Sequence, residues 1–151
     1  MSKQQWGNAT WYLMHTLAEK IKPEFENLTP YLFIEFKNIC ANLPCPDCAE
    51  HAIHMFNTAN SSLIVDKTSL VNFLHELHNR INIRLKKECM TINECKTKYQ
   101  NANTLAIIRH FFKTLTNIRT GERAMIYTLR RTQCLLGFRN FLNKFIHIFN
   151  F

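Results

Sequence analysis

Residues 44–56 read Pro-Cys-Pro-Asp-Cys-Ala-Glu-His-Ala-Ile-His-Met-Phe and place a Cys-x-x-Cys pair, Cys45 and Cys48, at the start of an expected helix. Pro44 ends the helix before it, Cys45 takes the N-cap position, and Pro46 suits the first helical turn. A thioredoxin would place this motif after a β-strand, and no such strand is evident. Two thiols at this spacing either close a disulfide or bind a metal, so the flanking sequence has to decide between them.

A compact zinc site can be tested on helix geometry. Cys45, Cys48, His51 and His54 form a C-x2-C-x2-H-x2-H series of potential ligands. On a helix, each step of three residues turns by about 300° and rises by about 4.5 Å, so the first and last ligands lie about 180° apart. These four side chains therefore cannot share one ion. A site that joins the two cysteines to distant ligands stays possible, but there is no second Cys-x-x-Cys to pair with, so we expect no metal. Disulfide chemistry fits better, because the free N–H groups at a helix N-terminus lower the pKa of a thiol there.

Composition points to a helical domain. The chain has 151 residues, enough for one ordinary domain with its own core. Hydrophobic residues make up 46% of it, and three glycines and four prolines are few for a β protein with many turns. Six unevenly spaced cysteines do not suggest a disulfide-stapled scaffold. With no signal peptide or apolar membrane span evident, we expect an all-α protein of a reducing compartment, the cytoplasm.

Apolar residues recur at helical spacing through almost the whole chain. They predict five helices in the first hundred residues, at about 6–21, 29–43, 45–59, 68–87 and 92–101. Thr29 is expected to cap the second helix, with Pro30 at its first position. The short connections are typical of antiparallel neighbours in a bundle. Two further helices, about 104–119 and 122–149, are expected to meet at a hinge at Thr120–Gly121.

Residues 101–151 carry most of the net positive charge, with eight Lys and Arg residues against one Glu. This charge fits either a solvated face of amphipathic helices or contact with an anionic partner, such as nucleic acid, an acidic protein or a membrane. An apolar stripe on the last helix could complete the bundle, form an oligomer interface or lie on a membrane. The stripe comprises Phe138, Phe141, Leu142, Phe145, Ile146 and Phe149. We expect a 1–100 domain followed by a basic helical extension, 101–151.

Three segments carry a resemblance to a known family. Residues 6–18 read WGNATWYLMHTLA, residues 43–51 read LPCPDCAEH, and residues 77–87 read LHNRINIRLKK. They are similar, in the same order, to the motifs W-G-R-x-x-W-x-x-L-H-x-x-A, Y-P-C-x-x-C-x-x-H and H-N-x-V-N-x-x-L-x-K of the Erv/ALR FAD-dependent sulfhydryl oxidases. The resemblance covers about residues 4–100. It implies a four-helix bundle plus a short fifth helix that binds FAD, usually as a homodimer.

The resemblance also implies roles for single residues. Cys48 would lie beside the flavin ring and pass electrons to it, and Cys45 would be the outer thiol that exchanges with substrate. The positions that match cofactor contacts are Gly7, Asn8, Trp11, His15, His51, His78, Asn79, Asn82, Lys86, Lys87 and Tyr99. Trp11 and His15, like His78 and Asn82, are i, i+4 neighbours, so each pair shares one helix face. Asn8 replaces the arginine of the family motif, which puts one contact to FAD in doubt.

The remaining cysteines depart from the family pattern. His75 stands where many cellular members have a cysteine in a structural disulfide, and some members from large DNA viruses also lack that cysteine. We therefore favour a viral origin, with the viral factory or the virion as alternative locations. Cys89 and Cys95 lie at a spacing that permits a local disulfide. Cys40 is expected to be a buried free thiol, and Cys134 a lone buried cysteine, a shuttle or an intersubunit bridge.

The preferred hypothesis is an FAD-linked thiol oxidase. It would convert thiols of a protein substrate or a thioredoxin-like relay into disulfides, pass the electrons to oxygen and yield hydrogen peroxide. A non-catalytic basic module that binds zinc or nucleic acid is the first alternative. A flavin-free protein that only relays disulfides is the second. The oxidase hypothesis predicts FAD, oxygen, a thiol partner and a second copy of the chain as partners, without nucleic acid or a transmembrane segment.

Overall fold

The computed structural model describes residues 2–118 and 125–151 of the chain. Within these ranges all regular structure is helical, apart from one isolated bridge between Ile21 and Phe149. The α-helices are α1 (Lys3–Lys20), α2 (Thr29–Ala41), α3 (Pro46–Thr58), α4 (Lys67–Arg84), α5 (Ile92–Gln100), α6 (Thr104–Thr116) and α7 (Met125–Phe145). Three short 3-10 helices join them: η1 (Pro23–Leu28), η2 (Ser61–Leu63) and η4 (Ile146–Ile148). The expected all-α class is confirmed, and the expected hinge at Thr120–Gly121 lies outside the described residues.

Local sequence accounts for most of the helix starts. The Ser2 hydroxyl accepts a hydrogen bond from the Gln5 backbone N–H, and the Gln5 side chain accepts one from the Ser2 N–H, which makes a capping box at α1. Asp66 and Thr91 form the equivalent boxes at α4 and α5. The prediction that Thr29 caps α2 is wrong. Thr29 is already helical, because η1 continues directly into α2 and leaves no extended residue between them.

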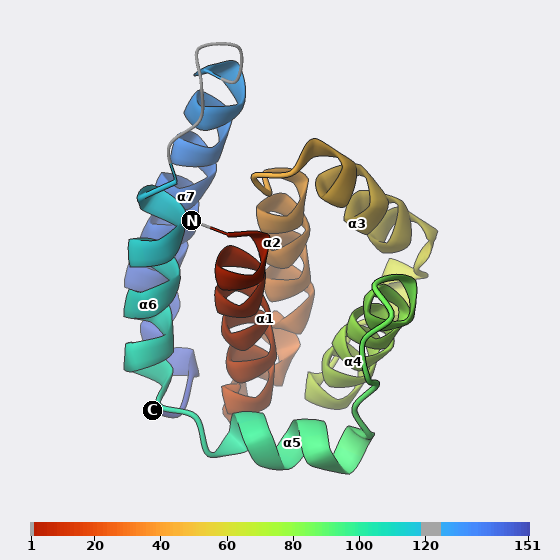
Figure 1. Cartoon of the computed structure of the whole chain (residues 1–151). Coiled ribbons are helices and arrows are strands. Elements are labelled where there is room, and N and C mark those ends of the chain that lie inside the picture. The colour runs from red at the N-terminus through yellow and green to blue at the C-terminus, as the bar shows by residue number, and fades with distance from the viewer. Residues whose placement is uncertain (1, 119–124) are drawn as a thin grey trace.

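Helix α1 lies between the two halves of the molecule (Figure 1). On one side α6 packs along it, and on the other it faces α4, while α2 packs against α3 and α7. Helix α5 crosses the ends of α1 and α4 and leads the chain from one half to the other. The N-terminal end of α1 and the C-terminal end of α4 lie on the same side of the molecule, so this pair is antiparallel.

The C-terminal helices share the core of the first five helices. Phe138, Leu142 and Phe149 from the apolar stripe are buried, so this half of the stripe completes the bundle, whereas Phe141, Phe145 and Ile146 are half-buried. The chain end is also fixed by backbone hydrogen bonds, because the Asn150 N–H donates to Lys20 O at 2.7 Å. In addition, the Thr104 hydroxyl donates to Asn150 O at 2.7 Å. Residues 101–118 and 125–151 are therefore a packed layer of the fold.

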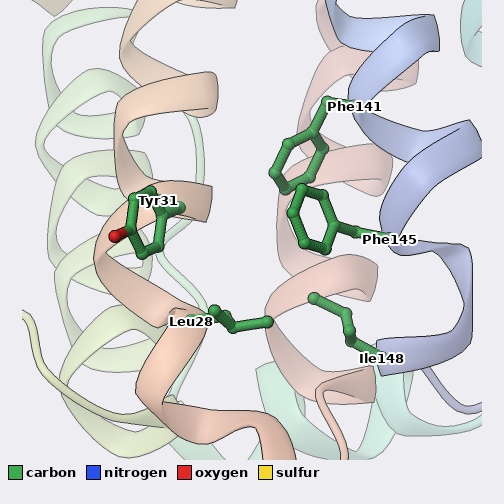
Figure 2. A pocket seen from close by; sticks show the side chains of 5 residues that line it. All are labelled: Leu28, Tyr31, Phe141, Phe145 and Ile148. Carbon is green, nitrogen blue, oxygen red and sulfur yellow. The ribbon is translucent and has the colours of Figure 1, made fainter.

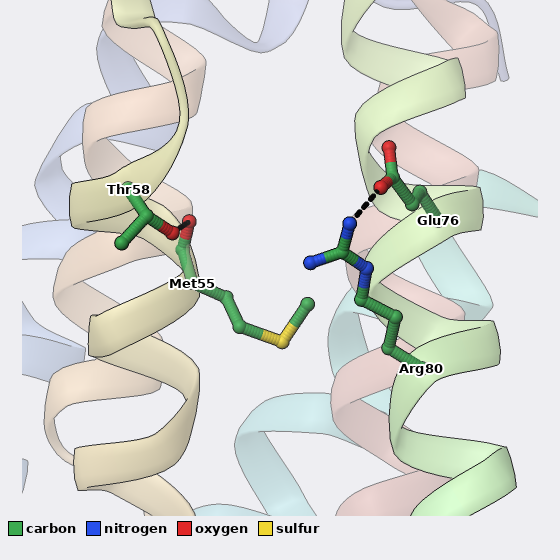
Figure 3. A network of polar contacts seen from close by, with 4 residues as sticks. All are labelled: Met55, Thr58, Glu76 and Arg80. Carbon is green, nitrogen blue, oxygen red and sulfur yellow. Dashed lines mark hydrogen bonds and ion pairs between the residues drawn. The ribbon is translucent and has the colours of Figure 1, made fainter.

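The outer surfaces of α3 and α4 make few polar contacts with each other. Figure 3 shows the Met55 side chain extending from α3 toward Arg80 of α4. Arg80 forms an ion pair with Glu76 one turn away, and both side chains are 61% exposed. The Thr58 hydroxyl donates back to the Met55 carbonyl at 3.2 Å. An exposed ion pair of this kind contributes at most about 1 kcal/mol, and it lies within α4. The two helices meet through apolar rings, because the centroids of Phe56 on α3 and Phe73 on α4 are 5.0 Å apart.

Candidate active site

The two thiols of the Cys-x-x-Cys pair lie at the N-terminus of α3. Cys45 is the N-cap, as predicted, and its sulfur accepts a hydrogen bond from the Cys48 N–H at 3.3 Å. Pro46 and Asp47 complete the first turn. Both cysteines are free and half-buried. One helix end therefore holds both sulfurs at a place that a substrate thiol can reach, which thiol–disulfide exchange requires.

Basic side chains from two other helices surround this dithiol. A hydrogen bond to Cys48 is the main cause that raises the pKa of Lys3, at the start of α1. Burial, and then the Cys45 thiol, raise the pKa of Cys48, and Lys3 offsets only part of that rise. The expected lowering is therefore wrong for Cys48 in the dithiol form. Burial and then the positive charge of Arg84, at the end of α4, lower the pKa of His51.

One side of α1 leads away from the dithiol. Lys3, Gly7, Trp11 and His15 recur at every fourth position, so they follow one another along this side. A Cβ atom added to Gly7 would meet no other atom within 4 Å. Open space therefore adjoins α1 between Lys3, which contacts Cys48, and the aromatic residues further along the helix. Asn8, beside Gly7, is exposed.

Aromatic rings from three helices meet where this side of α1 approaches α4 and α5. The Trp11 and His78 rings are stacked, with centroids 4.0 Å apart and an angle of 7° between their planes. Tyr99 stacks on His15 in the same manner, at 4.5 Å and 8°. A hydrogen bond of 3.0 Å joins His15 Nε2 to His78 Nδ1. The Cys95 sulfur lies 3.6 Å from His15 Nδ1, on the opposite edge of that ring.

The proton positions in this cluster follow from its burial. Burial raises the pKa of Cys95 to about 11, so its thiol keeps the proton and donates it to His15 Nδ1. His15 Nε2 then carries a proton and donates to His78 Nδ1. Burial is also the first cause that lowers the pKa of His78 to about 4 and the pKa of His15 well below its ordinary value. Both imidazoles are therefore neutral near pH 7.

Two side chains of α4 hold the segment that precedes α5. The Asn79 amide donates to Met90 O at 2.8 Å and accepts from Met90 N–H at 3.0 Å. His75 Nε2 also bonds to Met90 O, at 2.6 Å. Because Met90 occupies both polar atoms of the Asn79 amide, Asn79 positions this segment. We name the cluster of His75, Asn79 and Met90 the Met90 clamp. Because the clamp holds the segment before α5, it also fixes α5, which carries Cys95 and Tyr99.

Helix α4 ends earlier than predicted. The Lys86 N–H donates to Ile83 O at 3.1 Å, and the Lys87 N–H donates to Asn82 O at 2.8 Å, a Schellman pattern. Lys86 takes the left-handed conformation that this motif needs, with φ of 57°. The pattern ends α4 at Arg84 and turns both exposed lysines out of the helix. Asn82 itself is buried, one turn after His78.

The other cysteines divide into buried and surface positions. Cys40 is a buried free thiol as expected, and burial raises its pKa to about 12. Cys89 is exposed while Cys95 is buried against His15, and the two are not bonded to each other. Cys134 is half-buried on α7, and its thiol donates to Asn38 O of α2 at 3.5 Å. The local disulfide between Cys89 and Cys95 that the spacing permits is absent from the described residues.

The structure brings the residues named from the sequence together unevenly. Trp11, His15, His78 and Tyr99 form one cluster, and Gly7 lies beside open space on the same side of α1. The positions on the rim are His51, beside the dithiol, and the exposed Asn8, Lys86 and Lys87. Lys3, Arg84 and Cys95 were missed. Lys3 could have been found, since it lies four residues before Gly7, whereas the contacts of Arg84 and Cys95 depend on distant packing.

Comparison with known proteins adds independent information. Residues 8–102 match the Erv1 / Alr family. The chain is 26% identical over 96 residues to a fowlpox virus protein named as an FAD-linked sulfhydryl oxidase, a match that covers 64% of this chain and 97% of that protein. It is 27% identical over 97 residues to a protein of invertebrate iridescent virus 3 with the same designation, covering 63% and 66%. No solved structure gives a comparably significant match.

Two further properties concern the residues that the structure describes. None of their helices combines the length and apolar character needed to cross a membrane. Among the same residues, no three His, Cys, Asp or Glu side chains are placed to share a metal ion. The series from Cys45 to His54 thus makes no such group.

Proposed function

Because the chain belongs to the Erv1/Alr family, we propose that it is an FAD-linked sulfhydryl oxidase whose redox centre is the pair Cys45 and Cys48. One observation carries the assignment of the site. The open side of α1 at Gly7 connects Lys3, beside Cys48, with the stacked rings of Trp11 and His78. A large planar cofactor that lies along this side would touch both the dithiol and the aromatic cluster.

The side chains present fit FAD. Flat aromatic faces at Trp11 and His78 suit stacking with the adenine or the flavin ring. Positive charge for the pyrophosphate is near, because Lys98 and Lys87 both act on His78 and lower its pKa after burial does. Bound FAD supplies a two-electron acceptor that oxygen can reoxidise, with hydrogen peroxide as the product. His51, Asn8, Asn82 and Lys86 are proposed contacts at the edges of this site.

The two cysteines are proposed to act in turn. A substrate thiolate attacks the Cys45 sulfur of the Cys45–Cys48 disulfide, which forms a mixed disulfide and releases Cys48 as a thiolate. A second substrate thiolate then attacks the substrate sulfur, releases Cys45 and leaves the substrate as a disulfide. The substrate has then given two electrons to the protein, and the Cys45 and Cys48 thiolates take up two protons in place of the two that the substrate thiols released. Oxidation of the Cys45–Cys48 dithiol by FAD restores the starting disulfide.

Lys3 supports this division of roles. Cys48 is the group that raises the pKa of Lys3, at the start of α1, most strongly, while Cys45 is the N-cap of α3. A Cys48 thiolate that leaves the disulfide gains the charge of Lys3, which partly offsets the cost of its burial. We therefore assign Cys45 as the exchanging thiol and Cys48 as the electron donor to FAD.

A homodimer is also part of the proposal. An apolar cavity of about 300 Å³ lies between α2 and α7. Figure 2 shows the side chains that line it: Leu28, Tyr31, Phe141, Phe145 and Ile148. Tyr31 is 61% exposed at its edge, and Ile34, one turn along α2, is 52% exposed. Helix α6 packs along α1, so that side of α1 is already covered within the chain. We therefore propose that the exposed apolar area on α2, formed by Tyr31 and Ile34, makes the contact between subunits.

The test of the site replaces glycine by leucine. Gly7→Leu places a side chain in the open space beside α1, and Gly137→Leu on α7 is the matched control, since its Cβ also meets nothing within 4 Å. Both variants should fold, but Gly7→Leu should lose the flavin absorbance of the purified protein and its thiol-dependent oxygen consumption. Retention of flavin by Gly7→Leu would place the cofactor elsewhere.

The test of the chemistry uses the cysteines themselves. Cys48→Ser should abolish dithiol-dependent oxygen consumption while keeping the bound flavin. Cys89→Ser, at an exposed position outside the proposed centre, should leave turnover unchanged. A purified chain that is colourless and binds no FAD on reconstitution would contradict the oxidase and support one of the non-flavin alternatives.

A further inference from the structure

A second cavity lies away from the dithiol and the aromatic cluster. It has a volume of about 360 Å³ and lies between the C-terminal part of α6 and the N-terminal half of α7. Its lining combines two guanidinium groups, Arg131 and Arg139, with apolar side chains that include Leu115 and Leu135. The Thr132 hydroxyl in its wall already donates to a carbonyl of its own helix, at 2.8 Å. The arginines are therefore the donors that a ligand would find there.

Arg131 is the unusual member of this lining. Its side chain is only 4% exposed, and the cavity is where it meets accessible space. Among the described residues it has neither an ion pair nor a hydrogen bond, and burial lowers its pKa with no acidic group to oppose the change. A guanidinium group stays charged at any ordinary pH. A largely buried permanent charge without a counter-ion is costly. Because the guanidinium group of Arg131 meets accessible space at the cavity, an anion bound there would pair with it and reduce that cost.

Arg139 provides a second donor at the edge of the cavity. Its guanidinium carbon lies 4.6 Å from the centroid of the Phe112 ring, so the side chain is held by a cation–π contact. A guanidinium that stacks on a ring keeps its N–H groups at its rim, where they can bind phosphate oxygens. Arg131 and Arg139 are two turns apart on α7, and both line the same cavity.

The surface around the cavity suits an amphiphile. Four apolar side chains of α7 are more than half exposed: Met125 at 62%, Ile126 at 54%, Leu129 at 57% and Leu136 at 56%. Leu136 also lines the cavity. The segment that carries them has eight Lys and Arg residues against one Glu, which favours an anionic partner. Exposed aliphatic side chains beside basic groups are typical of a segment that lies on a lipid surface, whereas a nucleic acid would leave them in water.

We propose that the cavity between α6 and α7 binds the phosphate of an anionic phospholipid, with Arg131 and Arg139 as donors and the exposed apolar side chains of α7 in contact with the lipid surface. Inorganic phosphate carries the same chemical group as the lipid headgroup, so the experiment has to distinguish binding of free phosphate from binding of the lipid. This inference does not depend on the proposed oxidase activity.

The experiment measures how the full chain, with its flavin, sediments with vesicles. Vesicles of phosphatidylcholine are compared with vesicles that also contain phosphatidylserine. Arg131→Met keeps the side-chain volume and removes the charge, and Arg130→Met makes the same change at the exposed neighbour. We expect Arg130→Met to weaken binding to the anionic vesicles by about fivefold or less, the contribution of one surface charge. Arg131→Met should weaken it more than tenfold, and Arg131→Lys should fall between the two.

Each outcome bears on the proposal. If inorganic phosphate displaces the wild-type chain from the vesicles and raises its melting temperature, but does neither for Arg131→Met, the cavity recognises phosphate by itself. If phosphate has no effect while the difference between Arg131→Met and Arg130→Met persists, the lipid surface is required. Equal losses for the two variants, or equal binding to neutral and anionic vesicles, would overturn the proposal. Circular dichroism shows whether each variant is folded, and we expect Arg131→Met to keep its helix content because it removes an unpaired buried charge.

Discussion

Acidification should weaken the folded state through His78. Its ring is stacked on Trp11 and hydrogen-bonded to His15, and burial followed by the charges of Lys98 and Lys87 lowers its pKa from 6.5 to about 4. In the unfolded chain His78 has its ordinary pKa. The unfolded state therefore binds more protons than the folded state at every pH between these two values.

The sign and size of the effect follow from this difference. The contribution of neutral His78 to the free energy of unfolding is fully present above about pH 6.5. It is lost progressively as the pH falls, and below about pH 4 it changes no further. Between about pH 7 and pH 5, linkage gives a loss of about 2 kcal/mol in the free energy of unfolding from His78 alone. His15, whose pKa is also lowered, adds a loss of the same sign. Protonation of His15 would place a proton on both of its ring nitrogens, so His15 could no longer accept the hydrogen bond from Cys95.

Urea denaturation of the purified chain at the two pH values measures the effect. His78→Gln should reduce the loss between about pH 7 and pH 5 by about 2 kcal/mol, because glutamine does not titrate. His54→Gln, the same change at an exposed histidine of α3, is the control and should keep the wild-type loss. Equal losses for wild type and His78→Gln would refute the reasoning, since His78 would then titrate alike in the folded and unfolded states.

Three further predictions concern other parts of the molecule. Lys3→Met should raise the pKa of Cys48 further, whereas Lys113→Met on α6 should leave it unchanged. The pH dependence of Cys48 alkylation in a Cys45→Ser background measures this pKa. His75→Ala removes one bond of the Met90 clamp and should cost about 1 kcal/mol in urea denaturation, with faster amide exchange in α5 and unchanged exchange in α6. Leu142→Ala should destabilise the fold by about 2–5 kcal/mol, and the exposed Leu136→Ala by less than about 0.5 kcal/mol.

Local signals in the sequence were enough to predict the helices and the position of the dithiol. Cys45 was recognised as an N-cap because its signal, a preceding proline and Pro46 after it, lies within three residues. Thr29 carried a similar local signal and failed, because η1 removed the extended residue that a cap needs. The end of α4 was also missed. A lysine in the left-handed conformation, as at Lys86, has no signature that distinguishes it from a helical lysine.

The contacts inside the site depend on packing between segments that are distant in sequence. His15 and Cys95 are 80 residues apart and meet only because α5 crosses the end of α1. The raised pKa of Cys48 has the same origin, since burial and not the helix end is its first cause. Motif resemblance named His15 and Cys48, but it contained no information about the protonation of either group. Geometry from several helices was needed for that.

The C-terminal extension packs on the helix that carries part of the proposed site, although it lies outside the family match. That match ends at residue 102, whereas α6 and α7 form a layer against α1 and α2 and bury Phe111, Leu115 and Phe138. The fowlpox relative, covered to 97% by 96 residues, is too short to hold counterparts of all seven helices. In this chain α6 packs along α1 and covers one side of it. Because Lys3, Gly7 and Trp11 lie on that same helix, removal of residues 101–151 should reduce flavin binding as well as stability.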